Sequence, residues 1–235
     1  MASTYLSKTF SSDTTAGRRK WTWSAWVKRS TLGTASWLFH AWVNASNENS
    51  IFFDSSDRLS FSIYEGNNNN NGRLRSTRKF RDTNAWYHLQ FVWDSANSTA
   101  SDRMIIYVNN ERLTAFDDNI SGGSNHQTLI NKSGTEHSIG RYGSGTYYFG
   151  GSISHVHFSD GYALAPTVFG EEDASTGEWK IKTDPSFTLG TNGFTILKDG
   201  NTITDQSTNS NNWTLGGGTL TKTEDCPSNV FATLN

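Results

Sequence analysis

Residues 86–110, WYHLQFVWDSANSTASDRMIIYVNN, constrain the fold of the chain more than any other stretch. In its first part, alternate residues are large and apolar and line one face of a pleated strand: Tyr87, Leu89, Phe91 and Trp93. Residues 104–108, MIIYV, are apolar throughout, which suits a second strand buried between two sheets. The polar segment between them is long for a tight hairpin but ordinary for a surface loop. The two strands therefore predict a core formed by stacked β-sheets.

Short strands bounded by Ser, Asn and Gly clusters are expected on both sides of this pair, at residues 21–28, 37–43, 51–54, 59–64, 73–80, 138–141 and 149–159. In the first of these, alternation places four apolar side chains on one face: Trp21, Trp23, Ala25 and Val27. An edge strand followed by a turn at residues 15–17 is expected before it, and residues 117–135 are expected to be rich in loops. The segment 65–72, EGNNNNNG, is too polar to be buried and is expected to form an exposed loop.

After Gly161 the character of the sequence changes. Residues 163–170, ALAPTVFG, are typical of a short helix, because Pro166 suits its first turn and Gly170 its end. Three short strands are expected beyond it, at residues 178–182, 193–199 and 213–215. This pattern predicts a sandwich over residues 1–165 and a small C-terminal annex of short strands over residues 166–235, either separate or packed on the sandwich.

The composition favours a large β domain that is made without export. The 235 residues include nine Trp, eight Tyr and fourteen Phe, which supply a sizeable core. The formal net charge is −2 and Lys and Arg are scattered, so nucleic acid is not expected as a partner. No apolar run is long enough for a signal peptide or a membrane span, and Cys226 is the single cysteine. We therefore expect no internal disulfide, no membrane insertion and assembly in a reducing cytoplasm.

Several segments, taken in order, resemble the laminin-G-like branch of the concanavalin A-like lectin/glucanase fold. They are WTWSAWV at 21–27, the Trp-x-His and Trp-Asp pairs within 86–94, YVNN at 107–110 and FGGSISHVHFSDG at 149–161. This resemblance covers roughly residues 5–165 and implies an all-β, antiparallel jelly-roll β-sandwich, to which a small β-rich annex is added. It implies little about chemistry, because the fold hosts lectins, glycosidases, adhesion modules and spacers.

A second resemblance spans nearly the whole chain. The opening MASTYL and the segments GFTILKD at 193–199, DQSTNSNN at 205–212 and CPSNVFATLN at 226–235 are similar to laminin-G-like or tail-fibre-like virion structural proteins of tailed bacteriophages, many of them marine. The resemblance implies a protein of the virion surface, as a capsid decoration or a tail-fibre and host-attachment component, that is made in the host cytoplasm. The partners it implies are other virion proteins, further copies of the chain in a homo-oligomer, and a host-surface glycan.

Catalysis is not expected. A retaining glycosidase places two carboxylates about 5 Å apart, usually as alternating acids on one strand, and the sequence has no such pattern. The acidic residues 171–173 fit a solvated turn better than a catalytic pair. No Gly-x-Ser-x-Gly nucleophile motif and no phosphate-binding glycine loop occurs. A free carbohydrate-binding lectin and a polysaccharide hydrolase on the same fold are the alternatives to a virion protein.

No cofactor or metal ion is assigned. His155 and His157 are separated by one residue on a predicted strand, so both rings leave one face at a spacing that suits a metal. No third ligand has a defined spacing, and hydrogen-bonded or solvent-facing histidines are the alternative. Laminin-G-like domains often hold calcium at the sandwich rim, and this resemblance makes Asp94, Asp102 and Asp160 the acids to test.

For ligand binding, the informative segment is 141–148, RYGSGTYY. Tyrosines on a Gly/Ser loop offer flat surfaces for sugar rings and hydroxyl groups for hydrogen bonds, and the same composition serves protein interfaces. The candidate ligand-binding residues are Arg141, Tyr142, Tyr147 and Tyr148, with Tyr64, Arg73 and Arg75 beside the Asn-rich loop as a second surface. The alternative is that Tyr147 and Tyr148 anchor the hairpin to the core.

Overall fold

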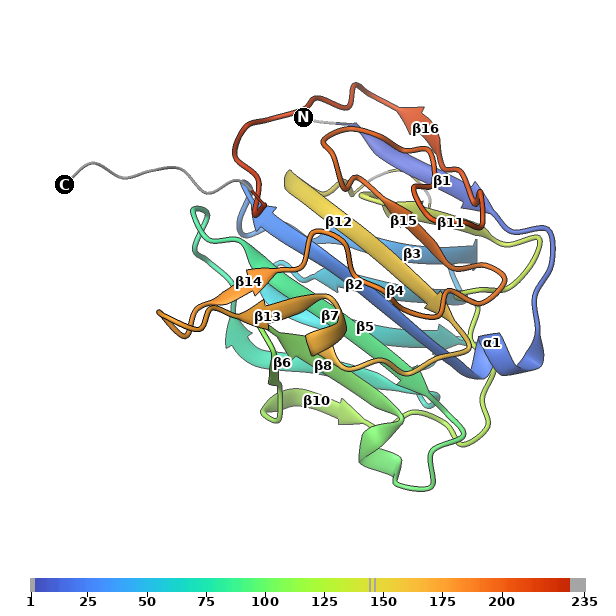
Figure 1. Ribbon diagram of the computed structural model, residues 1–235. Helices are drawn as coiled ribbons and strands as arrows, with labels where there is room; N and C mark the ends of the chain where they lie inside the picture. The colour runs from blue at the N-terminus through green and yellow to red at the C-terminus, as the bar shows by residue number, and fades with distance from the viewer. Residues whose placement is uncertain (1–2, 144, 146, 229–235) are drawn as a thin grey trace.

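Two antiparallel β-sheets face each other across a core in the computed structural model, which describes residues 3–143, 145 and 147–228 (Figure 1). The larger sheet has eight strands in the order β10-β6-β5-β4-β3-β11-β1-β16. The smaller sheet has six strands in the order β15-β12-β2-β7-β8-β9. This arrangement confirms the predicted all-β, antiparallel jelly-roll sandwich.

The strands of the larger sheet are β10 (Phe116–Ile120), β6 (Arg73–Lys79), β5 (Arg58–Glu65), β4 (Asn47–Phe53), β3 (Ser36–Asn44), β11 (Glu136–Ile139), β1 (Tyr5–Thr9) and β16 (Thr214–Gly217). Those of the smaller sheet are β15 (Phe194–Ile196), β12 (Gly151–Asp160), β2 (Lys20–Arg29), β7 (Tyr87–Asp94), β8 (Met104–Val108) and β9 (Glu111–Arg112). A separate hairpin contains β13 (Gly170–Glu172) and β14 (Trp179–Ile181). The helical elements are α1 (Thr15–Arg19) and the 3-10 turns η1 (Ala100–Asp102) and η2 (Pro166–Val168). Within the described ranges, no helix has the length and apolar character that a membrane span requires.

The apolar faces predicted from alternation form the core between the sheets. All four apolar residues predicted for one face of β2 are 0% exposed, and the predicted apolar face of β7 is buried beside it. Aromatic contacts join the two sheets across this core. The rings of Trp23 in β2 and Phe39 in β3 are stacked, with centroids 5.8 Å apart and planes at 13°. Contacts of this kind stabilise the fold by about 0.5–1.5 kcal/mol beyond the burial of apolar area.

Three local predictions are wrong, and a fourth, that residues 117–135 are rich in loops, is right only for residues 121–135. Residues 15–17 belong to helix α1, whose start is capped by the Thr14 hydroxyl, which accepts a hydrogen bond from the Gly17 amide at 2.9 Å. Residues 116–120 form β10 and not a loop, because they pair with β6 at the sheet edge. The helix predicted at 163–170 is reduced to the single turn η2, since β13 begins at Gly170. The predicted N-terminal edge strand β1 is an inner strand, because β16 pairs with its outer side.

The C-terminal segment adds a strand to each sheet, since β15 pairs with β12 and β16 with β1. Asp205 holds the corner after β15, because its carboxylate accepts hydrogen bonds from the amides of Thr195 and Asn211 at 2.9 and 2.7 Å. The side-chain amides of Asn209 and Asn211 each donate to the carbonyl oxygen of Gly193 at 3.0 Å. The Asp and Asn residues of the segment 205–212 therefore form a structural corner.

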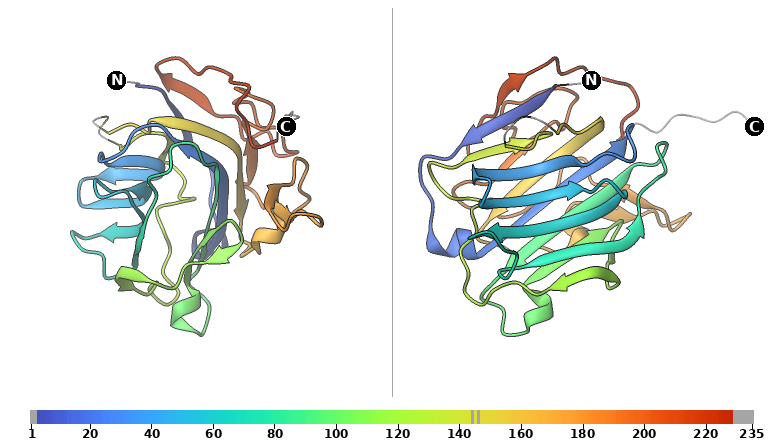
Figure 2. Two further views of the ribbon diagram at one scale, coloured as in Figure 1. Left: turned by 90° about the vertical axis from the view of Figure 1, so that its left-hand side faces the viewer. Right: turned by 180° about the vertical axis from the view of Figure 1, so that it is seen from behind.

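The hairpin of β13 and β14 covers the outer face of the six-stranded sheet (Figures 1 and 2). Trp179 of β14 stacks on His88 of β7, with centroids 5.9 Å apart, and donates from Nε1 to Nδ1 of His88 at 3.0 Å. Nearby, Nε2 of Gln90 donates to the carbonyl oxygen of Leu164 at 2.6 Å. On the opposite side of the molecule, strands β3 to β6 lie at the front of the rear view (Figure 2, right). The outer face of the eight-stranded sheet is therefore the broad open face of the sandwich.

Candidate functional site

Cross-strand register places rows of side chains on the outer face of the eight-stranded sheet. Directly opposite residues of neighbouring strands point to the same side of a sheet, so the register identifies each row. Running from β3 toward β6, the rows contain Trp42, Glu48 and Tyr64; His40, Ser50, Ser62 and Arg73; and Trp37, Phe52, Ser60 and Arg75. Most of the aromatic residues gather at the β3 end of this face, and the arginines at the β6 end.

A β-bulge in β3 explains why Trp37 and Trp42 share this face. An unbroken strand would place positions 37 and 42 on opposite faces, because their spacing is odd. The pairing of β3 with β4 shifts between Trp37 and Phe39, and Leu38 at the shift is buried in the core. Trp37 instead stacks on Phe52 on the outer face, with centroids 4.8 Å apart and planes at 6°.

Residues 140–143 and 147–149 form the two arms of a hairpin that folds back over this face. Its two arms are joined by a hydrogen bond from the amide of Tyr142 to the carbonyl oxygen of Tyr147, at 2.9 Å. The amide of Gly143 donates to Nδ1 of His40, also at 2.9 Å. A Cβ atom at position 143 would lie 2.2 Å from Cγ of Trp42, so the close approach requires glycine. The hairpin is therefore seated directly on β3.

The hairpin adds two tyrosine rings to those of the sheet. Tyr142 stacks on His40 at 5.0 Å between centroids and contacts Trp37 at 4.7 Å. Tyr147 lies 5.4 Å from Trp37 and is 45% exposed. We use the term aromatic face for Trp37, Trp42, Phe52, Tyr64, Tyr142 and Tyr147. Apart from the buried Trp37, these residues are exposed or partly exposed, so their rings form a surface that a ligand can contact.

Hydrogen bonds beneath the aromatic face hold Tyr142 and His40 in place. Nε2 of His40 lies 2.7 Å from Oε2 of Glu48, and the Tyr142 hydroxyl is hydrogen-bonded to the same carboxylate. Because Nδ1 of His40 accepts the Gly143 amide, the ring proton of the neutral imidazole lies on Nε2, which donates to Glu48. Burial, followed by the negative charge of Glu48, raises the pKa of Tyr142 to about 12. The Tyr142 phenol therefore stays protonated at neutral pH and acts as a donor.

The structure brings three of the predicted site residues together. Tyr142 and Tyr147 come from the hairpin, and Tyr64 lies directly across from Glu48, the residue that holds Tyr142. Of Tyr147 and Tyr148, the two residues of the anchor alternative, Tyr147 is 45% exposed and Tyr148 is partly exposed. The tyrosine that is stacked on His40 and hydrogen-bonded is Tyr142. The two surfaces that the sequence suggests separately are thus partly one surface.

The remaining predicted residues lie on either side of the aromatic face. The guanidinium of Arg141 turns toward β1, where it lies 3.7 Å from the ring centroid of Tyr5 and pairs with Glu136. Tyr148 faces the same ring at 6.3 Å between centroids. On the other side, Arg73 and Arg75 both pair with Asp118 of β10, at 3.0 and 3.1 Å.

Sequence reasoning missed His40, Trp42, Glu48, Trp37 and Phe52 as neighbours of the 141–148 segment. The signal that was available is the short turn between β3 and β4, which places Trp42 directly opposite Glu48. The bulge at Leu38 has no comparable signature in the sequence, so the position of Trp37 on the outer face required the structure.

The acids considered for calcium each have a protein partner and lie on different elements: Asp94 pairs with Lys20, Asp102 with Arg112, and Asp160 accepts from Asn131 and Asn192. Among the described residues, no group of three or more His, Cys, Asp or Glu side chains is arranged to hold a metal ion. The rings of His155 and His157 lie 6.3 Å apart, and a bulge between them interrupts the strand pairing. Burial lowers the pKa of both histidines, to about 4 for His155, so both are neutral at pH 7.

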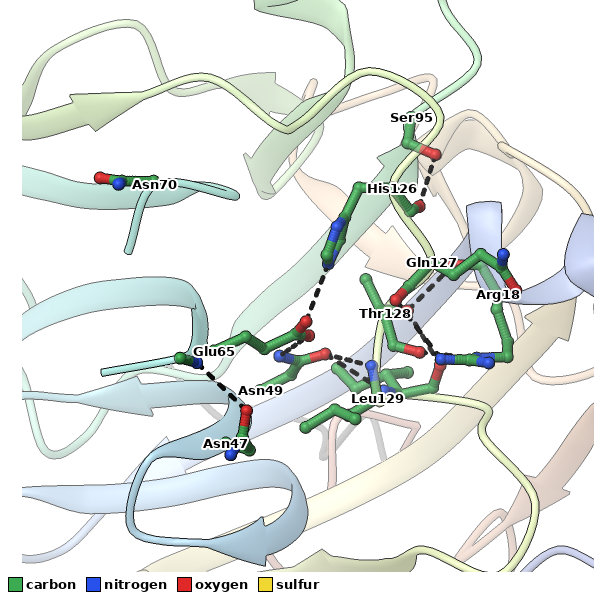
Figure 3. A network of polar contacts seen from close by, with 12 residues as sticks. Arg18, Asn47, Asn49, Glu65, Asn70, Ser95, His126, Gln127, Thr128 and Leu129 are labelled. Atoms are coloured by element: carbon green, nitrogen blue, oxygen red, sulfur yellow. Dashed lines mark hydrogen bonds and ion pairs between the residues drawn. The ribbon is translucent and has the colours of Figure 1, made fainter. Parts of the chain in front are cut away.

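A second polar cluster joins strands β4 and β5 to residues 126–129 (Figure 3). The side chain of Asn49 donates to Oε1 of Glu65 at 2.9 Å and accepts from the amide of Leu129 at 2.5 Å. Nε2 of His126 lies 3.1 Å from Oε2 of Glu65. Burial by itself would raise the pKa of Glu65, but hydrogen bonds from His126 and Asn49 outweigh it, and the pKa is lowered. Because its polar groups already have protein partners, this cluster serves to fix residues 126–129 against β4 and β5.

Comparisons with known proteins agree with the architecture. Residues 3–169 match the laminin-G-like family model described as the concanavalin A-like lectin/glucanases superfamily. A search of curated protein sequences finds no match. Among solved structures, a candidate carbohydrate binding protein from Bacteroides ovatus is similar over 97% of this chain and 62% of its own, with 18% identity and a TM-score of 0.55.

Two further structures are similar over smaller parts of the chain. A pentraxin from Limulus polyphemus is 17% identical over 68% of this chain and 71% of its own, with a TM-score of 0.47. Domain 4 of an extracellular arabinanase from Geobacillus stearothermophilus, in complex with arabinotriose, is 18% identical over 63% of this chain and 64% of its own, with a TM-score of 0.43. The present chain thus spans less than two thirds of the Bacteroides and Geobacillus chains.

The family match covers more than half of the chain. The two antiparallel sheets of the protein enclose one core that is rich in aromatic residues. The protein therefore belongs to the concanavalin A-like lectin/glucanases superfamily.

Proposed function

We propose that the protein binds carbohydrate on the aromatic face and does so without catalysis. The observation that carries this proposal is the clustering of Trp, Tyr and Phe rings on the open face of the eight-stranded sheet, with the hairpin seated over them through Gly143. Tyr and Trp present a flat apolar ring and a polar group together, which suits a ligand whose rings have apolar faces and hydroxyl edges.

Polar groups beside the rings supply partners for sugar hydroxyls. The side chain of Glu48 is 16% exposed. Arg73 and Arg75 are about one quarter exposed, at 25% and 24%, and share Asp118. Partly exposed charged groups that are held by a neighbour are already oriented, so less conformational entropy is lost when a ligand binds them.

Binding is favoured over hydrolysis by the state of the carboxylates on this face. The superfamily includes both lectins and glucanases by description, so membership alone is compatible with either. Glu48 is engaged by His40 and Tyr142, and Glu136 by Arg141. The strand register also places Trp42 between these two acids. A glycosidase needs one carboxylic acid to give a proton and a second carboxylate to act as nucleophile or base. Both acids on this face are instead engaged by neighbouring side chains, which favours binding.

A glycan array followed by calorimetry with the best ligand tests this proposal. Truncating Tyr147 or Trp42 to Ala removes an aromatic contact, and we expect each variant to lose about ten-fold or more in affinity, equivalent to about 1.4 kcal/mol. Tyr162→Ala is the matched control, because Tyr162 is 43% exposed, similar to Tyr147, and lies outside the aromatic face. Equal losses in all three variants, or sugar release during incubation, would contradict the proposal.

We also propose a setting for this binding: the surface of a tailed-phage virion, as a capsid decoration or a tail-fibre component. The resemblance of the opening residues and of the segments 193–199 and 205–212 to such proteins supports it. Quantitative mass spectrometry of purified particles tests the setting, with a fixed copy number per particle as the expected result. A protein that is absent from particles and recovered only from the surrounding medium would indicate a free lectin.

A further inference from the structure

A cavity of about 340 Å³ lies outside the aromatic face, under the C-terminal segment of the described chain. Its floor comes from both sheets, because β1 and β11 of the larger sheet and β12 of the smaller one contribute to it. Its roof is the segment 219–226, which we call the strap. Figure 1 shows the chain leaving β16 and crossing to the end of β2, with the tip of β12 between them.

The floor of the cavity is apolar in part, with Ser152 and Ser154 of β12 beside the apolar side chains. Leu6, Ile139, Phe149 and Leu197 line it and are at most 8% exposed. Protein interiors are normally filled to the density of an organic crystal, and unfilled apolar volume lowers stability. The strap sequence TLTKTEDC offers a single large apolar residue, Leu220, to fill the space. The strap therefore leaves the cavity above these side chains unfilled.

The strap is fastened at both ends, which holds the roof away from the floor. At one end, the Thr4 hydroxyl donates to the carbonyl oxygen of Thr219 at 2.9 Å and accepts from its amide at 3.1 Å. At the other end, Asp225 accepts from Lys28 at 2.6 Å and from Nε1 of Trp86 at 2.9 Å. The two carboxylate oxygens of Asp225 thus accept hydrogen bonds from Lys28 in β2 and from Trp86, which precedes β7.

One positive charge at the cavity, Lys222, forms no ion pair with the residues that the structure describes. Lys222 lines the cavity from the middle of the strap, and its methylene groups lie against Gly200. Among the described residues, no carboxylate forms an ion pair with Lys222, whereas Lys28 is paired with Asp225. An apolar floor below a single unpaired ammonium group is complementary to a molecule with an apolar body and one anionic end.

We propose that this cavity binds a small amphipathic carboxylate, with its hydrocarbon body on the floor and its carboxylate at Lys222. The volume lies within the range of small-molecule sites, which begins near 300 Å³. The site shares no residue with the aromatic face, so this proposal does not rest on glycan binding.

Calorimetry on the whole protein tests this proposal. The ligands are octanoate, decanoate and dodecanoate, each below its critical micelle concentration. Each methylene group buried on the floor should raise the affinity about four-fold until the cavity is filled. Decanol is the neutral comparison, and it should bind more weakly than decanoate. Lys222→Met keeps most of the side-chain stem and removes the charge, so we expect it to weaken decanoate about ten-fold and leave decanol nearly unchanged.

Two further variants locate the site. Lys79→Met is the matched control, because Lys79 is exposed at the end of β6, far across the larger sheet, and it should change nothing. Leu220→Trp fills the cavity from the strap and should abolish binding of both decanoate and decanol. If Leu220→Trp fails to fold, Lys222→Met still decides, since it alters an exposed side chain. Affinity that is independent of chain length, or a decanoate affinity that Lys222→Met and Lys79→Met change equally, would overturn the proposal.

Discussion

The amide of Gly143 donates to Nδ1 of His40 at 2.9 Å, and through this bond a fully buried histidine positions a surface hairpin. The opposite ring nitrogen of His40 is 2.7 Å from Glu48, whose carboxylate also holds Tyr142. An amide can only donate, so the hairpin is seated as observed while Nδ1 of His40 carries no proton. The exposed part of the candidate site is therefore positioned by a histidine that lies fully buried beneath it.

Gly143→Ala should displace the hairpin, because the new Cβ would lie 2.2 Å from the indole of Trp42. We expect glycan affinity to fall at least ten-fold, and the free energy of unfolding to fall by about 1–3 kcal/mol, as for overpacking. Calorimetry and thermal unfolding measure the two effects. Gly177→Ala, in the turn between β13 and β14, is the control: its φ of +72° makes alanine strained, but no atom lies within 4 Å of the new Cβ. That variant should lose stability and keep glycan affinity, whereas unchanged affinity in Gly143→Ala would remove the hairpin from the site.

Tyr142 should make the protein less stable in alkali. Its pKa is raised from the ordinary value of 10 to about 12 by burial and by Glu48, so the folded state holds the phenol proton more tightly than the unfolded state. The stabilisation of the folded state by the protonated Tyr142 phenol is complete below pH 10 and is lost as the pH rises through 12. Tyr142→Phe has no proton to lose and should show a flatter decline between pH 10 and 12. Urea unfolding of both proteins at several pH values in this window measures the difference, and parallel curves would contradict it.

The parts of the fold that follow from local chemistry could be predicted from the sequence. Alternation in β2 and β7 identified the core faces, because every second side chain of these long strands is apolar and the strands are unbroken. Alternation failed where the backbone departs from regular pairing. At Leu38 a bulge reverses the facing of Trp37, and between Ser154 and His157 another interrupts β12. A bulge inserts one residue and requires no particular residue type there, so its position could not be predicted from the sequence.

The candidate site was predictable in part for a related reason. Tyr142 and Tyr147 stood out because they flank glycine and serine in one short segment. Glu48 and His40 belong to a different hairpin, and their relation to Tyr142 depends on how residues 140–149 fold over β3. Such contacts between segments about 100 residues apart are set by the packing of the whole sheet, which local sequence patterns do not encode.

Mild acid should destabilise the protein through four buried histidines: His88, His137, His155 and His157. Burial lowers the pKa of each, to about 3 for His88 and about 4 for His137 and His155, so the folded state keeps them neutral. The unfolded state takes up these protons below pH 6.5, so the stability present above pH 6.5 is lost as the pH falls toward 4.

The slope of the unfolding free energy against pH measures this uptake. Near pH 5.5 the unfolded state should bind up to about four protons more than the folded state, a slope of up to about 5 kcal/mol per pH unit. Carboxylates with lowered pKa, such as Glu65, contribute mostly below pH 5 and do not account for a slope at pH 5.5. A free energy of unfolding that stays flat from pH 7 to 5.5 would show that these histidines are not held neutral.

The ion pair between Arg29 and Asp57 should be the most sensitive polar contact of the fold. Its N–O distance is 3.0 Å, and the two side chains are 0% and 3% exposed. Asp57→Ala would leave the Arg29 guanidinium buried without its carboxylate, and we expect the free energy of unfolding to fall by about 3–5 kcal/mol. Arg81 pairs with the same carboxylate at 2.9 Å but is 59% exposed, so Arg81→Ala should cost at most about 1 kcal/mol.

Replacing both partners separates the net contribution of this ion pair from the penalty of a lone buried charge. The double variant Arg29→Met, Asp57→Leu removes both charges and fills similar volume, so it should recover much of the stability that Asp57→Ala loses. The recovery would be incomplete, because Arg29 also donates to the carbonyl oxygen of Phe80 at 2.6 Å and its guanidinium lies 4.3 Å from the ring centroid of Phe53. Urea unfolding of the single and double variants gives the comparison. A double variant that is less stable than Asp57→Ala would mean that the contacts of Arg29 with Phe80 and Phe53 stabilise this end of β2 by more than the unpaired charge destabilises it.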